Sequence, residues 1–252
     1  KVALSRCQPT QVSARSFNNH IGVPLSLVRL HADTAFSVLE MGMNHAGELE
    51  ALSVLAKPDI AIITTVEAAH AEYFDSVEAI ADAKAEIFTG ITPGGTAILN
   101  RDNPHFSRLA SAAGACGVDN ILSFGTSADA DVRLLKQCLQ QDCSTVIADI
   151  AGQPMMYKVG APGPHWVMNS LAVLATVLVA DADLGLAGLA LQDIMVPEGR
   201  GRRHLIPYRD GSLLVIDDSY NASPASMRVA LETLGRARGT ANERRSATRR
   251  IA

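Results

Sequence analysis

The sequence predicts an α/β fold built on a mainly parallel sheet flanked by helices. The first observation is that short apolar segments alternate along the chain with segments of helical periodicity. The second is that the predicted strands at 59–66 and 96–100 are mostly apolar, as strands covered on both faces are. Such alternation is typical of βα units with parallel strands.

The elements follow one another in a regular order. After a short opening helix and a β-compatible stretch at 10–14, we expect strands at 36–40, 59–66, 96–100 and 120–124, and helices at 48–56, 77–88, 106–116, 169–180 and 186–194. Shorter β-leaning segments fill 130–159 and are broken at Asp142 and at Gly152, which predicts a small antiparallel appendage.

A basic, glycine-rich stretch at 197–203 predicts a linker, with a strand at 213–216 and a helix at 225–237 beyond it. We therefore expect two domains, at 1–197 and 198–252. The chain begins inside a helical pattern, without a start methionine or an N-cap, and its last residues resemble the start of a strand. Both domains are thus expected to be truncated pieces of a longer protein.

Composition excludes several classes of function. The net charge of −4 gives no electrostatic reason to bind nucleic acid, and 4% aromatic residues give little base-stacking surface. The four cysteines form no CxxC pair, which is typical of free thiols in a reducing compartment. No apolar run reaches the roughly 20 residues of a membrane span, and no signal peptide is present, so we expect a cytoplasmic protein.

The helix at 77–88 carries an unexpected residue. Its periodicity places Lys84 on the same face as Val77, yet lysine is rarely buried. One interpretation is that the ammonium snorkels to water. The other is that Glu40, His70 and Lys84 meet at one sheet edge and hold an ion, which requires CO₂ to carbamylate the neutral amine. A purely structural role for His70 is equally open.

Two polar clusters lie in the last third of the chain. Asp217 and Asp218 follow a predicted strand, where they can accept hydrogen bonds from ribose hydroxyls or cap the next helix. Arg200, Arg202 and Arg203 suit a phosphate clamp, or form a solvated basic loop. No GxxxxGK[ST] segment occurs in the 252 residues to cradle the phosphates of ATP.

Three asparagines also allow two roles each. Asn169 opens a predicted apolar helix, so it either caps that helix or contacts an adenine. Asn18 and Asn19 lie in a polar loop, as turn residues or as donors to a substrate.

Taken together, these segments resemble the Mur ligase family, and within it the members that add D-alanyl-D-alanine. The matching segments are FNNHIGVPL at 17–25, EMGMNHAGE at 40–48, EAAH at 67–70, ADAKAEIF at 81–88, GPHWVMNSL at 163–171, GR at 199–200 and DDSYNASP at 217–224. They extend over nearly the whole chain. Trp166 and Ser223 depart from the family, in which asparagine is common at both positions.

The resemblance implies an ATP-dependent carboxylate–amine ligase of peptidoglycan synthesis, and so of cell wall biogenesis, cell shape and cell division. It would join D-alanyl-D-alanine to UDP-N-acetylmuramoyl-tripeptide through an acyl phosphate. It also implies that 1–197 is a central ATP- and Mg²⁺-binding domain whose phosphate loop precedes Lys1. Residues 198–252 would begin a Rossmann-like C-terminal domain, and the fragment alone would be inactive.

The resemblance also assigns roles to individual residues. Glu40 and His70 become Mg²⁺ ligands, Lys84 a carbamylated lysine at a second Mg²⁺, Asn169 a contact to adenine, Arg200 a contact to phosphates, Asp218 and less directly Asp217 contacts to ribose, and Asn18 and Asn19 contacts to the substrate.

Other functions stay open at this point. Another Mur ligase or a folylpolyglutamate synthase-type ligase would share the metal and nucleotide residues, and a non-catalytic α/β binding domain would lack the chemistry. The third peptide residue of the substrate, the modification of Lys84 and the oligomeric state, expected to be monomeric, do not follow from the sequence.

Overall fold

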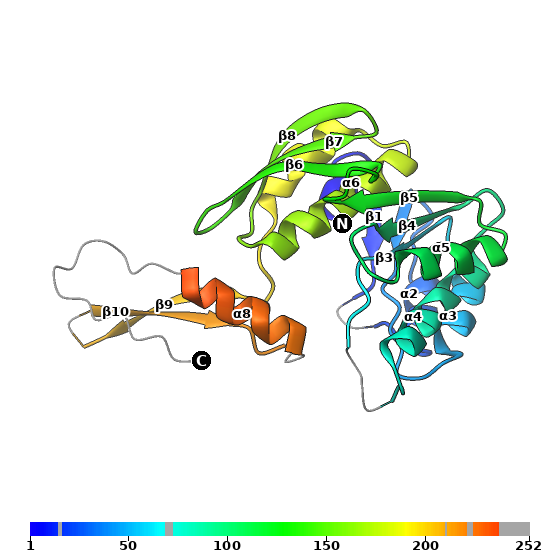
Figure 1. Ribbon diagram of the computed structural model, residues 1–252, viewed down its shortest axis with the longest axis horizontal. Helices are drawn as coiled ribbons and strands as arrows, with labels where there is room; N and C mark the ends of the chain where they lie inside the picture. Colours follow the sequence, from blue (N-terminus) through cyan, green and yellow to red (C-terminus); the bar gives the residue numbers. More distant parts are fainter. Residues whose placement is uncertain (15–16, 69–72, 210, 221–223, 237–252) are drawn as a thin grey trace. The chain divides into compact units, whose positions relative to one another are not determined.

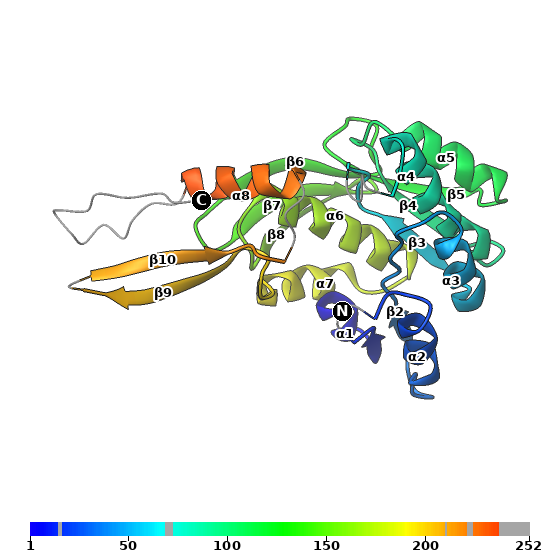
Figure 2. The same ribbon diagram turned by 90° about the horizontal axis from the view of Figure 1, so that it is seen from below.

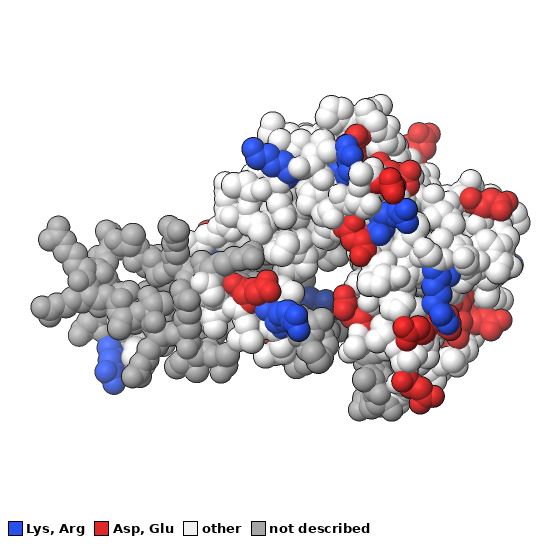
Figure 3. All heavy atoms as spheres, viewed as in Figure 1, with Lys and Arg blue, Asp and Glu red and all other residues white. Residues whose placement is uncertain are grey.

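The computed structural model describes residues 1–14, 17–68, 73–209, 211–220 and 224–236 (Figure 1). The chain divides into two compact units, residues 1–194 and 195–252. On the face of the first unit that Figure 3 shows, acidic and basic side chains are interspersed. Among the described helices, none is both long enough and apolar enough to cross a membrane.

The first unit is built on a six-stranded sheet in the order β3-β4-β5-β6-β7-β8. The strands β3 (Ile60–Ile63), β4 (Thr96–Asn100), β5 (Asn120–Gly125) and β6 (Val132–Leu139) are parallel to one another. β7 (Ser144–Ile150) and β8 (Gln153–Val159) continue the sheet in antiparallel pairs. The predicted α/β class, with a mainly parallel sheet and an antiparallel extension, is confirmed.

A second, separate sheet precedes it in the chain. β1 (Thr10–Val12) pairs in parallel with β2 (Phe36–Val38), with Thr10 opposite Phe36. β2 has no ladder with β3, so among the described strands each of these two leaves one edge unpaired.

Helices cover both faces of the parallel strands. On one face lie α3 (Glu48–Ala56), α4 (Val77–Ala85), the 3₁₀ turn η1 (Glu86–Gly90) and α5 (Phe106–Ala115). Ala97 and Leu99 of β4 point into this core, because alternate residues of a strand face the same side. Ile98, between them, is fully buried on the other face, where α6 (Pro164–Val179) contacts β4 (Figure 2).

Four short helical elements complete the first unit. They are α1 (Val2–Ser5), α2 (Gly22–Val28), α7 (Leu184–Ala190) and the 3₁₀ turn η2 (Leu191–Asp193). α1 contacts α7, and α2 contacts α3.

The start of α6 differs from the prediction. The helix begins at Pro164, five residues before the predicted start, with Gly163 as its N-cap residue. Proline suits the first helical position, because its fixed φ matches the helix and because an N–H at this position would have no partner within the helix. Asn169 therefore lies in the second turn, and the interpretation of Asn169 as an N-cap is wrong.

The second unit contains an antiparallel pair and a helix. β9 (Arg202–Tyr208) pairs with β10 (Gly211–Asp217), and α8 (Pro224–Arg236) follows. Arg202 and Arg203 were expected in a linker, but they begin β9. Their polar side chains do not give the pattern of a strand. The strand forms because every residue of β9 has a pairing partner in β10. The Rossmann-like continuation of this unit stays a prediction.

Gly90 provides a test of the packing between η1 and α3. A Cβ added at Gly90 would lie 2.1 Å from the backbone carbonyl of Ser53. The side-chain hydroxyl of Ser53 also donates a hydrogen bond to the carbonyl of Ile87 in η1. We expect Gly90→Ala to lower the free energy of unfolding by about 1–3 kcal/mol, as overpacking does. Urea denaturation of the purified chain measures this.

Gly114 is the matched control. It lies in α5 with nothing within 4 Å of an added Cβ. Gly114→Ala is expected to leave the stability unchanged or to raise it by up to about 1 kcal/mol. Equal effects of the two substitutions would contradict the described contact between η1 and α3.

Candidate functional site

A cavity of about 640 Å³ lies between the facing edges of β2 and β3. Residues 34–41 border it on one side and residues 56–65 on the other. Its remaining lining includes Leu49 of α3, Ile87 of η1 and Thr176 of α6. The cavity is therefore as long as the strands that flank it and has helices on both faces.

Glu40 is an exposed residue of the cavity lining that lies two positions beyond β2, because the strand predicted at 36–40 ends at Val38. Its backbone N–H donates to Ser13 Oγ at 3.4 Å, and its carboxylate Oε1 accepts a hydrogen bond from Asn18 Nδ2 at 3.0 Å. Thr64 and Thr65 follow β3 and line the same cavity. Carboxylate and hydroxyl oxygens are therefore available at the ends of two neighbouring strands.

Lys84 lines the same cavity from α4. The helix starts with Ser76 as its N-cap, whose hydroxyl accepts a hydrogen bond from the N–H of Ala79 at 3.1 Å. Burial lowers the pKa of the Lys84 ammonium, and no carboxylate of the described residues forms an ion pair with it. Both effects increase the fraction of neutral amine at a given pH.

Two asparagines that the sequence did not single out hold the segment after β3. Asn100 Nδ2 donates to the carbonyl of Thr64 at 3.0 Å. Asn103, only 8% exposed, donates to Thr65 Oγ1 at 3.2 Å and to the carbonyl of Val66 at 3.1 Å. The two threonines at the end of this apolar run could have indicated a polar segment after the strand, but we assigned both threonines to the strand.

The structure describes only some residues of the predicted ion site. His70 lies outside the described residues, and its role as a ligand stays a prediction. Over the described ranges, no three His, Cys, Asp or Glu side chains are grouped so that they can hold a metal ion. Glu40, Thr64 and Thr65 supply oxygen donors, which suit Mg²⁺, an ion that usually keeps several water ligands.

Asn169 is exposed and lies on the face of α6 that reaches the cavity. Thr176 and Ala180, which line the cavity, follow Asn169 by seven and eleven residues, so the three positions share one side of the helix. Seven residues correspond to about 10 Å along the helix axis. Asn169 is thus placed beyond one end of this lining.

The second unit brings together part of its predicted nucleotide site. Asp217 Oδ1 accepts hydrogen bonds from the hydroxyl of Ser219 at 2.6 Å and from its N–H, and Oδ2 accepts one from the N–H of Gly199 at 3.2 Å. These bonds lower the pKa of the Asp217 carboxyl. The Arg200 guanidinium lies 4.4 Å from the centre of the Tyr220 ring. Arg200 and Asp217 therefore belong to one pair of adjoining turns, with Asp218 next in the chain.

Asn18 and Asn19 have different surroundings. Asn19 Oδ1 accepts hydrogen bonds from the N–H groups of Ile21 and Gly22, at 3.1 and 2.9 Å, and so holds the turn before α2. Asn18 instead reaches Glu40. Contact of either residue with a substrate stays a prediction.

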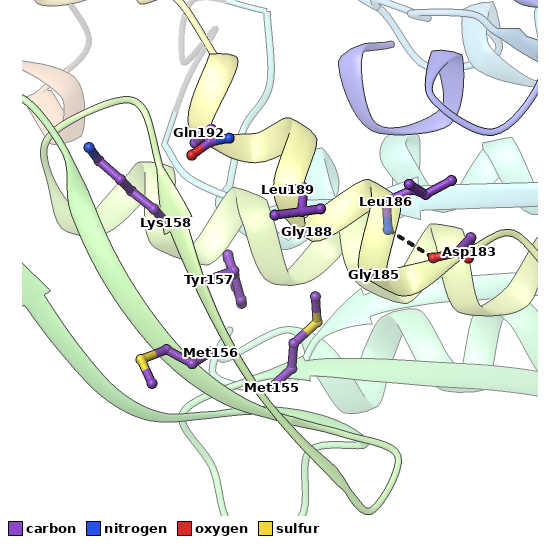
Figure 4. A pocket seen from close by; sticks show the side chains of 10 residues that line it. All are labelled: Met155, Met156, Tyr157, Lys158, Asp183, Gly185, Leu186, Gly188, Leu189 and Gln192. Carbon is purple, nitrogen blue, oxygen red and sulfur yellow. Dashed lines mark hydrogen bonds between the residues drawn. The ribbon is translucent and has the colours of Figure 1, made fainter.

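A second cavity, of about 470 Å³, lies between β8 and α7 (Figure 4). Met155 extends toward α7 at Gly188, where an added Cβ would lie 2.1 Å from the methionine Cε. Among the predicted site residues that the structure describes, none lines this cavity.

The fold and the first cavity define a class of protein. It is an α/β protein with a mainly parallel sheet, in which polar side chains gather where strands end. Open sheets of this kind bind their ligands at the carboxyl ends of the strands.

Comparison with known proteins identifies the family. Residues 2–177 match the Mur ligase middle domain, so the chain belongs to the Mur ligase family. It is 34% identical over 229 residues to UDP-N-acetylmuramoyl-tripeptide–D-alanyl-D-alanine ligase of Rickettsia prowazekii, covering 88% of this chain and 49% of that protein. It is 35% identical to the Bacillus subtilis enzyme of the same name, covering 86% and 45%. The chain thus spans about half the length of these relatives.

Solved structures agree with this assignment. The fold matches a crystal structure of MurF from Acinetobacter baumannii with a TM-score of 0.86 and 29% identity, over 94% of this chain and 51% of that one. A structure of a mutant of FPGS from L. casei matches with a TM-score of 0.63 at 17% identity, over 79% and 47% of the two chains. The latter likeness shows the fold alone.

The lowered pKa of Lys84 gives a test by pH. The desolvated ammonium destabilises the folded state at pH values below the folded-state pKa, and this cost disappears as the pH rises through that pKa toward the ordinary value of 10.5. We expect Lys84→Met to be more stable than the wild type at pH 7, and the difference to shrink at pH 10. Urea denaturation in CO₂-free buffers measures it.

Lys158→Met is the control, because Lys158 is an exposed residue of β8. Its stability difference from the wild type should not change between the two pH values. A difference for Lys84→Met that stays constant with pH would contradict a desolvated amine at this position.

Proposed function

We propose that the protein containing this chain is an ATP-dependent ligase that joins D-alanyl-D-alanine to UDP-N-acetylmuramoyl-tripeptide through an acyl phosphate. The observation that carries the proposal is that Lys84, which forms no ion pair among the described residues, lines the same cavity as Glu40 in a chain of the Mur ligase family. The curated relatives of Rickettsia prowazekii, Bacillus subtilis and Escherichia coli carry the name of this activity. Peptidoglycan synthesis in the cytoplasm by a monomer is the setting we propose.

Lys84 acts in this proposal as a carbamate. Its neutral amine attacks the carbon of CO₂ and releases a proton, which converts a base into an anion with two oxygen atoms. Desolvation favours this reaction because it lowers the pKa and so increases the neutral fraction. With Glu40 and His70, the carbamate would provide ligands for Mg²⁺. The bound metal would supply positive charge that offsets the repulsion between phosphate and carboxylate.

We also propose nucleotide contacts within each unit. Asn169, on the cavity-lining side of α6, would contact the adenine. Arg200 would contact the phosphates, and Asp217 and Asp218 the ribose hydroxyls. Support comes from the adjoining turns that carry Arg200 and Asp217, and from the hydrogen bonds that Asp217 accepts from Ser219 and Gly199. A MurF structure from Thermotoga maritima was determined in complex with ADP, although at 24% identity its likeness concerns the fold.

We further propose that residues 1–197 are a central domain that another strand of the same protein completes. Phe36 donates to Pro9 and Val38 accepts from Ser13, so these residues of β2 point toward β1. Successive residues of a strand alternate in direction, so Ser37 and Leu39 direct their backbone groups into the cavity.

The same alternation applies to β3. The carbonyl of Asp59 accepts from the N–H of Thr96 in β4, so Ile60 and Ile62 direct their backbone groups away from β4 and into the cavity. Unpaired backbone groups along a strand edge are available to pair with a further strand. A strand between β2 and β3 would provide partners for these groups and would be covered on both faces by the helices that line the cavity, as buried parallel strands are.

The choice of amine tests the proposed reaction. The full-length protein, given ATP, Mg²⁺ and UDP-N-acetylmuramoyl-tripeptide, is expected to release ADP with D-alanyl-D-alanine and not with D-alanine or L-glutamate alone. A preference for a single amino acid would instead favour another Mur ligase, and a preference for glutamate with a folate would favour a folylpolyglutamate synthase. No ADP with any amine would favour a non-catalytic domain.

In the same assay, Lys84→Ala should reduce turnover by about 100-fold or more, the upper end of losses at metal-site positions. Formate or acetate should restore part of it by standing in for the carbamate. Lys158→Ala is the control and should keep wild-type turnover. Wild-type turnover by Lys84→Ala would remove Lys84 from the proposed mechanism.

A further inference from the structure

We propose that Asn18 is a positioning residue that fixes the carboxylate of Glu40, and that position 42 is glycine because the Asn18 side chain fills the space of a Cβ. The inference rests on the proposed function, in which Glu40 holds a metal ion.

Asn18 contacts the turn after β2 on both sides of Met41. Its side-chain Nδ2 donates to Glu40 Oε1 at 3.0 Å, and its backbone carbonyl accepts from the N–H of Gly42 at 2.8 Å. One residue therefore binds the carboxylate and the backbone two positions further on. A rotation of the Glu40 side chain away from the cavity would break the first bond while the second still holds the turn.

Gly42 shows how closely this contact is fitted. A Cβ built at Gly42 would lie 2.7 Å from Asn18 Nδ2 and 3.0 Å from Asn18 Cγ. The backbone at Gly42 does not adopt a positive φ, so a left-handed conformation is not the reason for glycine there. The requirement for glycine at this position comes from the asparagine side chain.

The two residues that flank Asn18 in the chain are both fixed against the start of α2. Asn19 holds the turn before α2 through Ile21 and Gly22. Phe17 packs its backbone against Gly22, where an added Cβ would lie 2.5 Å from the Phe17 Cα. The backbone that carries this donor is thus anchored at the start of α2.

The chemistry of an amide suits this task. A neutral donor orients the carboxylate and leaves its negative charge available, whereas a lysine or arginine at position 18 would neutralise it. Only Oε1 is engaged by Asn18, so Oε2 stays available as an acceptor. Partners that orient metal-binding side chains in this way contribute to metal affinity.

Metal affinity is the first test. Mn²⁺, which is visible by electron paramagnetic resonance, is titrated into the full-length protein in the presence of ADP. We expect Asn18→Ala to weaken Mn²⁺ binding about tenfold, at the lower end of the effect of such partners, and Glu40→Gln to weaken it further. Asn120→Ala is the control, since Asn120 donates to the carbonyls of Gly94 and Gly95, outside the cavity lining.

The outcomes separate the two proposals. Absence of Mn²⁺ binding to the wild type, or unchanged binding by Glu40→Gln, would overturn the proposed function. Weakened binding by Glu40→Gln together with wild-type binding by Asn18→Ala would overturn the role of Asn18 alone.

A double-mutant cycle on the stability of the 252-residue chain tests the fit without a metal. Gly42→Ala should lower the urea midpoint in the wild-type background, because the new methyl group meets the Asn18 amide. In the Asn18→Ala background the same change should leave the midpoint unchanged. Equal losses in both backgrounds would overturn the assigned reason for glycine at position 42.

Discussion

The structure depends on two unpaired strand edges that face each other, those of β2 and β3. Their backbone groups point into a cavity that has helices on both faces. Unpaired backbone donors and acceptors along two facing edges can pair with a further strand, and the space between them is suited to one. The same geometry brings the ends of two strands together, and with them the side chains of Glu40, Thr64 and Thr65.

The chemistry proposed for this cavity follows from its surroundings. Apolar walls desolvate Lys84 and lower the pKa of its ammonium, which a surface position on α4 would not do. Asn18 orients Glu40 without removing its charge. Asn100 and Asn103 fix the segment that follows β3. Two features connect the fold to the proposed ligase mechanism. They are a lysine whose pKa is lowered by burial and a carboxylate held by a hydrogen bond.

The sequence was informative where one local pattern decides the structure. β4 and most of the helix predicted at 77–88 follow from apolar runs and helical spacing, as does the inward position of Lys84. The α-helix ends at Ala85 and continues as the 3₁₀ turn η1, and the strand predicted at 59–66 is shortened to Ile60–Ile63. Prediction failed where partners distant in the chain decide. β9 starts with two arginines and forms because it pairs with β10. The first turn of α6 was assigned to a loop because it begins with Pro164. The contact of Asn18 with Glu40 joins residues 22 positions apart.

Amide hydrogen exchange tests the central claim most directly, because it reports on the unpaired edges themselves. In the 252-residue chain, the amides of Ser37, Leu39, Ile60 and Ile62 should exchange much faster than that of Ile98, which lies in β4 between two paired strands. In the full-length protein, these four amides should be protected to the level of Ile98. Fast exchange that persists in the full-length protein would contradict the account, as would full protection of the edges in the 252-residue chain.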